Sequence, residues 1–264
     1  MRLQKGGFMR RNLVVAGSML GALMLTTAPA AAQSPAPSPV RNSSPEFLFG
    51  APHGSIGVRA SFLVAREGGD LFSFVREQLT VEKGDFNGPG ATIDFAFNLR
   101  PRVSVVADID ITRSSVDSES RPYLGSDGLP IAQTSRLAQT NFSGGLKFAL
   151  LPPGQHISRY AWIPSTIVPY VSAGGGAMYH RFSQNGEFVD FVDLSVFQAN
   201  LESSGWAPSA YVALGADIRM VKQVYLSVEG KYLVAHDSLQ KDFAGFDGID
   251  LAGFRFGTGV QVAF

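Results

Sequence analysis

The fold is decided by residues 91–112, which read ATIDFAFNLRPRVSVVADIDIT. Apolar and polar residues alternate on both sides of the Arg100-Pro101 pair, with Asp94, Asp108 and Asp110 at polar positions. Because successive side chains of a strand point to opposite faces, each half predicts a β-strand with one apolar and one polar face. The short break between the halves predicts an antiparallel hairpin.

The same alternation recurs in six other segments between Gly54 and Phe264. The resulting number of strands is even, as single-chain bacterial membrane barrels require. The segment 168–182 is the least regular, because Gly174-Gly175-Gly176 interrupts it, and we expect a bend or a close packing site there. The predicted strands cover residues 56–64, 91–99, 103–112, 138–150, 168–182, 210–218, 224–234 and 254–264.

The connections between these segments alternate in length. Two are short turns, at 99–102 and 220–223, and a third, Pro-rich one covers 151–165. Short turns on one side and long loops on the other are typical of outer-membrane barrels, whose short turns face the periplasm. The sequence therefore predicts an all-β, eight-stranded antiparallel up-and-down transmembrane β-barrel with both ends on the periplasmic side. Its four long loops would cover residues 66–88, 114–134, 183–205 and 236–248.

Charged residues indicate which face of the strands points inward. The polar faces carry five basic and five acidic side chains near the middle of strands. Inside a narrow barrel such a balance is expected, because buried charges must be paired. A soluble barrel with these charges outside is the alternative. We expect a lumen filled by a paired network of Arg59, Asp94, Asp108, Asp110, Lys147, Asp217, Arg219, Glu229, Lys231 and Arg255.

The N-terminus predicts export through the Sec pathway. Four basic residues precede an apolar run at 13–25, and Ala30-Ala31-Ala32 offers a cleavage site. The run is too short for a transmembrane helix, although a membrane anchor is the alternative. We therefore expect a signal peptide at 1–32, a flexible Pro-, Ser- and Ala-rich leader at 33–53 and an outer-membrane barrel at 54–264. Met1 and Met9 are both possible starts.

Composition excludes several classes of function. The chain has 22 basic and 22 acidic residues, and removal of 1–32 leaves a net charge of −4. A mildly acidic exported chain does not suit nucleic-acid binding, which needs clustered Lys and Arg. The absence of cysteine excludes disulfides, thiolate metal sites and a lipid-modified cysteine anchor.

The C-terminus alternates to its last residue, with Val260, Val262 and Phe264 on one face. It resembles the C-terminal strand by which outer-membrane barrels are recognised during assembly. Residues 54–264 resemble the small eight-stranded outer-membrane proteins, which include the transmembrane domain of outer membrane protein A, the opacity proteins and outer membrane protein W. The resemblance implies a Gram-negative outer-membrane location. The partners it implies are lipids, lipopolysaccharide, periplasmic chaperones and the barrel assembly machinery.

Three classes of function remain open. The first is a non-enzymatic structural, adhesive or interaction role through the four loops, whose partner the sequence does not name. The second is a small-molecule conduit, with Gly174–Gly176 as the weak place between strands. The third is lipid A modification: His236 and Ser238 resemble the His-x-Ser pair of lipid A deacylase barrels, with Asp250 as the carboxylate, although the flanking Val234 and Leu239 depart from that family's pattern.

Of these classes, we expect the non-enzymatic one. We also expect no cofactor and no metal site, because the four histidines are scattered and no pair has the spacing of metal ligands. The acidic segment 187–193 is a solvated loop on this interpretation, with a cation site as the alternative.

Overall fold

The computed structural model describes residues 47–264, except residues 126–127, 191 and 194. The expected signal peptide and most of the leader lie outside the described residues, so cleavage after Ala32 remains a prediction. The described residues all belong to one compact unit of the chain.

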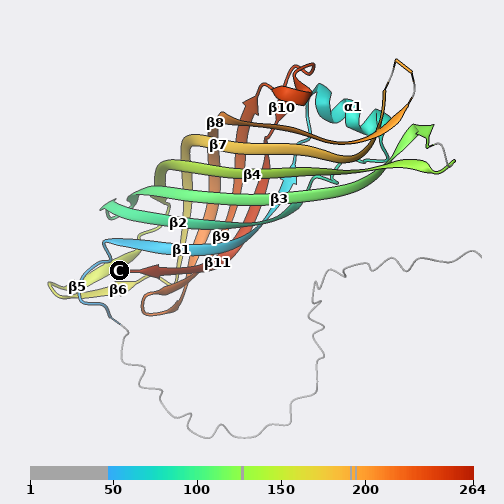
Figure 1. The fold of residues 1–264 in the computed structure, drawn as a ribbon. Coiled ribbons are helices and arrows are strands. Elements are labelled where there is room, and N and C mark those ends of the chain that lie inside the picture. Colours follow the sequence, from blue (N-terminus) through green and yellow to red (C-terminus); the bar gives the residue numbers. More distant parts are fainter. Residues whose placement is uncertain (1–46, 126–127, 191, 194) are drawn as a thin grey trace, which may run out of the picture. The chain divides into compact units, whose positions relative to one another are not determined.

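Eight antiparallel strands of the described chain close into a barrel (Figure 1). Each barrel strand pairs with the next in chain order, and the last pairs with the first, from Ser55 opposite Ala263 to Ala65 opposite Gly253. The predicted fold class is thus confirmed. The barrel strands are β1 (Gly54–Ala65), β2 (Gly88–Arg100), β3 (Val103–Leu124), β4 (Pro130–Ala149), β7 (Ile167–Val189), β8 (Val196–Val221), β9 (Val224–Asp237) and β11 (Gly253–Ala263).

The two faces of the barrel wall follow the predicted alternation. Apolar side chains point outward and are exposed around the ring; Phe256, for example, is 56% exposed. Polar side chains at the intervening positions are buried inside. Within the described residues, no helix is long and apolar enough to cross a membrane. The outward apolar belt includes Val58, Phe62, Ile93, Phe95, Phe97, Val105, Ile111, Phe142, Leu146, Val171, Val212, Leu214, Val228, Phe254 and Val260.

Two predicted loops, 114–134 and 183–205, are mostly strand. The β3–β4 ladder continues beyond Arg113 to Glu119 opposite Ala132, and the β7–β8 ladder continues to Val189 opposite Val196. Figure 1 shows both hairpins projecting beyond the barrel body. The prediction was wrong for the β3–β4 extension because both of its faces are mostly polar, so hydrophobic periodicity does not detect it. In the β7–β8 extension, the alternation of Phe197, Ala199 and Leu201 with polar residues was an available signal.

The remaining connections carry short elements. The first long loop contains the helix α1 (Asp70–Gln78), and the last contains the 3-10 helix η1 (Lys241–Phe243) and the strand β10 (Ile249–Asp250). On the opposite side, the Pro-rich connection forms a hairpin of β5 (Gly154–Ser158) and β6 (Ala161–Pro164).

Trp162 of this hairpin is buried. It is only 5% exposed and bridges to Leu48, so its ring packs within the protein. The neighbouring Tyr160 is exposed.

The glycine segment is a close packing site, as expected. Gly174 of β7 lies opposite Gly145 of β4, and the ring of Tyr211 packs over both. The ladder between β4 and β7 is continuous through this point, so the two strands do not separate there.

We expect Gly174→Ala to lower the free energy of unfolding by about 1–3 kcal/mol, the usual cost of overpacking. The new Cβ would clash with the carbonyl oxygen of Gly144, which is backbone and cannot move aside. Gly144→Ala is the matched control, since its Cβ would meet nothing closer than 3.7 Å. Urea unfolding measures both, and equal stability of the two variants would contradict the packing described.

Candidate functional site: the filled lumen

The lumen is filled by side chains in two layers, a charged layer in the middle and an apolar layer at the end that carries the long loops. A cavity lies at the other end, where the short turns are. The inward positions of β9 show the order directly: Tyr225 lies nearest the short turns, then Glu229 and Lys231, then Leu233 and Ala235. Every second side chain of a strand points inward, so the inward side chains of β9 pass through the layers of the lumen one after another.

Arg59 joins two carboxylates in the charged layer. Its Nη1 lies 3.0 Å from Asp94 Oδ1 and its Nη2 lies 3.2 Å from Glu229 Oε1. The second oxygen of Glu229 accepts a hydrogen bond of 2.9 Å from the hydroxyl of Tyr170. These side chains come from β1, β2, β7 and β9, so the contacts cross the lumen.

Lys231 is the centre of the network. Its ammonium lies 2.8 Å from Asp108, 3.2 Å from Asp110 and 3.9 Å from Glu229. The two aspartates also accept hydrogen bonds of 2.7 Å, Asp108 from Ser143 and Asp110 from Thr92. One buried cation therefore holds two neighbouring carboxylates of β3 that would otherwise repel each other.

Lys147 and Asp217 form a second ion pair nearer the short-turn end, at 2.6 Å. The ammonium of Lys147 also lies 3.7 Å from the ring centroid of Tyr170, a cation–π contact. Since the Tyr170 hydroxyl donates to Glu229, this ring links the pair to the rest of the network. A continuous chain of polar contacts thus runs through the middle of the barrel.

Two of the ten candidate residues, Arg255 and Arg219, form no ion pair among the residues that the structure describes. Arg255 donates a 2.8 Å hydrogen bond to Gln139 of β4. Arg219 is half-buried and forms no ion pair within the described chain. Parity fixed the face of both residues but could not fix their partners, because strand tilt offsets residues across the lumen.

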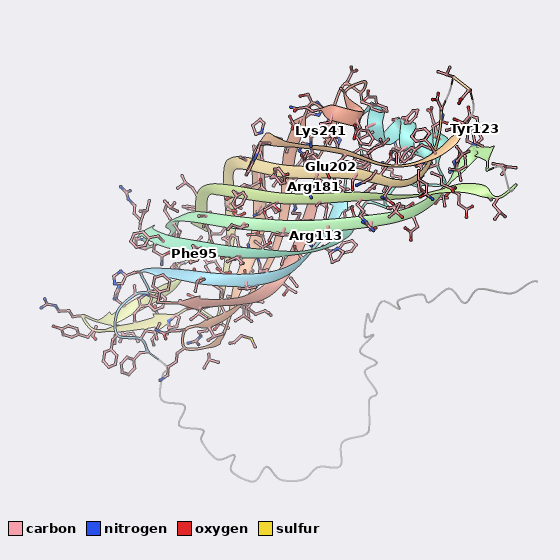
Figure 2. All side chains as sticks on the ribbon, viewed as in Figure 1. Phe95, Arg113, Tyr123, Arg181, Glu202 and Lys241 are labelled. Atoms are coloured by element: carbon pink, nitrogen blue, oxygen red, sulfur yellow. The ribbon has the colours of Figure 1, made fainter. Side chains whose placement is uncertain are left out.

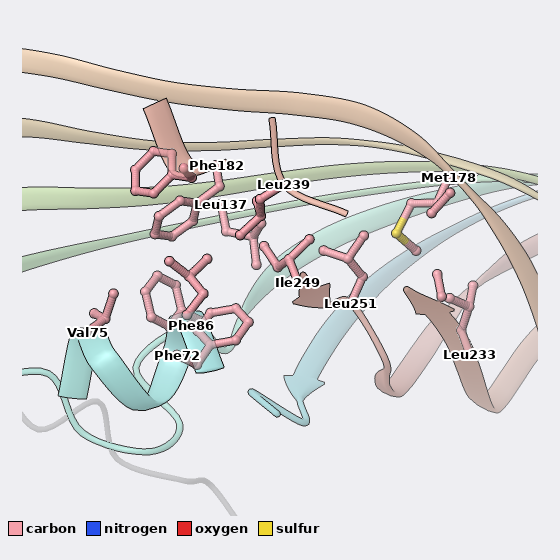
Figure 3. Close-up of a cluster of buried hydrophobic side chains, with 14 of the residues drawn as sticks. Phe72, Val75, Phe86, Leu137, Met178, Phe182, Leu233, Leu239, Ile249 and Leu251 are labelled. Atoms are coloured by element: carbon pink, nitrogen blue, oxygen red, sulfur yellow. The ribbon is translucent and has the colours of Figure 1, made fainter. Parts of the chain in front are cut away.

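An apolar cluster fills the outer end of the lumen (Figure 3). Phe72 of α1, Phe86 of the same loop and Phe182 of β7 contact one another edge-on or tilted, at centroid distances of 5.2–6.4 Å. Figure 3 shows Leu239, Ile249 and Leu251 of the last loop converging on the same cluster. The first and last loops therefore fold inward and plug the mouth, whereas the sequence predicted polar surface loops.

A hydrogen bond ties the two plugging loops together. The amide of Asp247 donates to the Asp70 carboxylate at 2.8 Å. This bond holds the pKa of Asp70 below its usual range. The amide of Leu71 donates to the other oxygen of the same carboxylate.

A buried polar pair lies at the level of the apolar plug. His180 of β7 is fully buried, and its Nδ1 lies 3.6 Å from Oδ2 of Asp237 on β9. Sequence reasoning grouped His180 with scattered histidines. His180 could have been predicted to face the lumen, because it alternates with outward residues at an inward position of β7.

The short-turn end of the barrel holds a cavity of about 380 Å³. Lys147, Asp217 and Tyr225 lie on its lumen side, and Gly154 and Trp162 of the β5–β6 hairpin line its other side. The ion pair of Lys147 and Asp217 separates this cavity from the charged layer.

The three catalytic candidates are not hydrogen-bonded to one another among the described residues. His236 lies opposite Asp250 in the β9–β10 pair, but no hydrogen bond joins His236 to Ser238 or Asp250 among the described residues. Asp250 instead faces Arg66 at 3.5 Å, and the amide of Ser238 donates to Asp237. Within the same residues, no three His, Asp or Glu side chains lie close enough to hold a metal ion.

Comparison with solved structures finds similar barrels. Neisserial surface protein A shares 11% identity, with 81% of this chain and 99% of that chain covered and a TM-score of 0.42. OprG from Pseudomonas aeruginosa shares 11% identity over 82% and 99%, with a TM-score of 0.44. The outer membrane protease OmpT from Escherichia coli shares 12% over 84% and 98%, with a TM-score of 0.34.

The eight-stranded antiparallel barrel is established by the strand pairing of the chain itself. No family model and no curated protein matches the chain. Unrelated functions share such folds, so the function must come from the site.

Proposed function

We propose that this protein is an integral outer-membrane barrel of a Gram-negative envelope that acts by binding through its extracellular hairpins, without catalysis or transport. The observation that carries the proposal is the filled lumen, because ion pairs around Lys231 and the plug around Phe72 occupy the route that a solute would take. Eight strands leave an interior just wide enough for side chains.

The exposed belt supports a membrane location. Large apolar side chains such as Phe95, Leu214 and Phe256 face outward around the ring, while ionised groups face inward. A soluble protein rarely exposes a continuous apolar surface of this extent. In a bilayer the same surface contacts lipid, and a closed barrel leaves no unpaired strand edge within it.

The tip of the β7–β8 hairpin supports a binding role. Phe188 and Phe197 pack at 6.1 Å near the tip, and Val192 is 94% exposed. Asp190 and Asp193 lie beside these apolar side chains and are exposed. A partner surface that combines apolar and basic groups complements this tip.

A labelling experiment on whole cells tests the location, because the chain has no native cysteine. We expect Val192→Cys to react with a membrane-impermeant maleimide on intact cells, since the residue lies at a hairpin tip. Tyr160→Cys, at the opposite end of the barrel, should react only after the outer membrane is permeabilised. Labelling of Tyr160→Cys on intact cells would reverse the proposed orientation.

The binding role is tested by adhesion of cells that express the protein to surfaces coated with an apolar, basic polymer. The double variant Val192→Ser/Phe197→Ser should reduce retention if the tip makes the contact. Tyr160→Ser, on the hairpin at the opposite end of the barrel, is the control. A variant of the barrel wall such as Phe256→Ser/Val260→Ser would not serve as a control, because it disturbs the lipid-facing belt. Unchanged retention of the tip variant would contradict the proposal.

The enzymatic alternative has its own test. We expect lipid A to show the same mass spectrum in cells that express the wild-type protein, His236→Ala or Ser238→Ala, because the candidate side chains are not hydrogen-bonded to one another. Loss of an acyl chain with the wild-type protein that either variant abolishes would show that the protein is an enzyme.

A further inference from the structure

Three arginines lie side by side on the outer surface of the barrel. In the register of the sheet, Arg113 of β3 and Arg181 of β7 both lie opposite Ala138 of β4. Arg136 lies two residues further along β4, opposite Ser115 and Ser183. The three positions form a triangle on adjacent strands, and Figure 2 shows Arg113 and Arg181 on the same side of the barrel.

All three arginines belong to the outward face of the wall. They follow the last apolar outward residues of their strands, Ile111 on β3 and Tyr179 on β7. All three are exposed, and the side chain of Arg181 is 54% exposed. They are therefore separate from the lumen network and reach beyond the apolar belt.

Aromatic residues mark the level of this triangle. Tyr179 of β7 lies opposite Trp206 of β8, their rings are 5.4 Å apart, and Trp206 is 59% exposed. Phe142 of β4 lies 6.0 Å from the same indole. Exposed Tyr and Trp residues gather where lipid headgroups meet the acyl chains. The arginines begin one outward position beyond these rings, at the level of the headgroups.

The charges around the triangle leave it positive. Glu202 lies 3.5 Å from Arg181, but it also faces Lys241 at 4.0 Å. Asp117, further out on β3, accepts a hydrogen bond from Thr134. Arg113 and Arg136 form no ion pair within the described residues. Two guanidinium groups are thus available to an anion, and the third, that of Arg181, is shared with Glu202 and with the Tyr179 hydroxyl.

The spacing suits a phosphate group. Neighbouring strands lie about 4.8 Å apart, so the backbones at Arg113 and Arg181 are separated by about 10 Å. Long side chains can converge from both sides over the small Ala138 between them. Guanidinium groups bind phosphate with paired hydrogen bonds, and charge-assisted bonds of this kind are the stronger ones.

We propose that Arg113, Arg136 and Arg181 bind the phosphate of a phosphorylated glycolipid in the outer leaflet. The proposal rests on the outer-membrane location proposed above. The acyl chains of the lipid would lie against the apolar wall and the rings of Tyr179 and Trp206, while the phosphate meets the arginines. The site would anchor one lipid at a fixed place on the barrel beneath the projecting hairpins.

Native mass spectrometry of the refolded barrel with bisphosphorylated lipid A tests this proposal. The triple variant Arg113→Gln/Arg136→Gln/Arg181→Gln should retain the lipid at least about tenfold more weakly, through loss of charge-assisted hydrogen bonds. Arg66→Gln is the control. Arg66 follows directly after the last residue of β1, outside the triangle, and its guanidinium is already paired with Asp250 at 3.5 Å. It should retain the lipid as the wild-type protein does.

Three outcomes would overturn the proposal. They are wild-type retention by the triple variant, equal retention of dephosphorylated lipid A, and full displacement of the lipid by inorganic phosphate at millimolar concentration, which would indicate a free-anion site. Heat-modifiability of each variant on gels establishes that the barrel has folded. The two proposals fail separately. If the wild-type barrel is folded and the cysteine variants react with maleimide as expected on cells, but the barrel does not retain lipid A, only the lipid site is contradicted. If the cysteine variants react in the opposite pattern, the proposed location is contradicted.

Discussion

Replacing Lys231 with methionine is expected to lower the free energy of unfolding by about 3–5 kcal/mol, the usual cost of removing one partner of a buried ion pair. The physical reason is that Asp108 and Asp110 both face the Lys231 ammonium, at 2.8 and 3.2 Å. Without it, two neighbouring carboxylates of β3 remain in a lumen where each is less than 10% exposed. Urea unfolding of the purified barrel measures the loss.

Two further variants sharpen this prediction. Adding Asp108→Asn and Asp110→Asn to Lys231→Met should recover part of the stability, because the repelling charges are then removed together. Lys241→Met is the exposed control: its ammonium lies 4.0 Å from Glu202, its side chain is 60% exposed, and such pairs contribute less than about 1 kcal/mol. Wild-type stability of Lys231→Met would refute the paired network.

Deleting Phe264 is expected to leave at most about one tenth of the folded barrel, since it removes three backbone hydrogen bonds worth about 1 kcal/mol each. The amide of Phe264 donates to Gly54 at 2.9 Å, and its carbonyl accepts from Gly54 at 3.1 Å and from His53 at 2.6 Å. These bonds close the seam between β1 and β11. The amount of heat-modifiable barrel in the membrane fraction measures the effect.

A variant of the same strand separates seam closure from loss of lipid-facing area. Phe256→Ala removes a phenyl ring of similar exposure but no seam hydrogen bond at the chain end. We expect it to assemble much better than the deletion. If the two variants assemble equally, Val260, Val262 and Phe264 do not form a distinct terminal assembly signal.

Strand identity was predictable from the sequence wherever one face had to be apolar. The segment 91–99 alternates because lipid-facing Phe95 and Phe97 must differ from inward Asp94 and Ala96. Beyond Arg113, where both faces of β3 are polar, the same backbone ladder continues without an alternating signal. Hydrophobic periodicity therefore predicts the part of a strand in which one face is apolar and the other polar, and not the full length of the strand.

The inward charges were predictable as a set, but their pairing was not. Parity placed Arg59, Lys231 and Arg255 on the same face, yet Arg59 meets two carboxylates whereas Arg255 meets Gln139. The sequence did not identify Tyr170 as part of the lumen network. In an irregular strand, an aromatic residue can equally belong to the outer wall or to ordinary core packing. Its role as a link between Lys147 and Glu229 depends on contacts across the lumen, which no local pattern records.

The plug at the outer mouth was missed for a different reason. The loop 66–88 is polar overall, and its apolar residues are spaced for a helix: Leu71, Phe72 and Val75 share one buried face of α1. That spacing was the available signal. Only the fold shows that this face packs into the barrel against Phe182.

Conductance of the purified protein in planar bilayers tests the central claim most directly. If the charged layer and the apolar plug fill the lumen, the wild-type barrel gives no steady ion conductance. Steady open-channel conductance of the wild-type protein would contradict the closed lumen and establish the protein as a conduit.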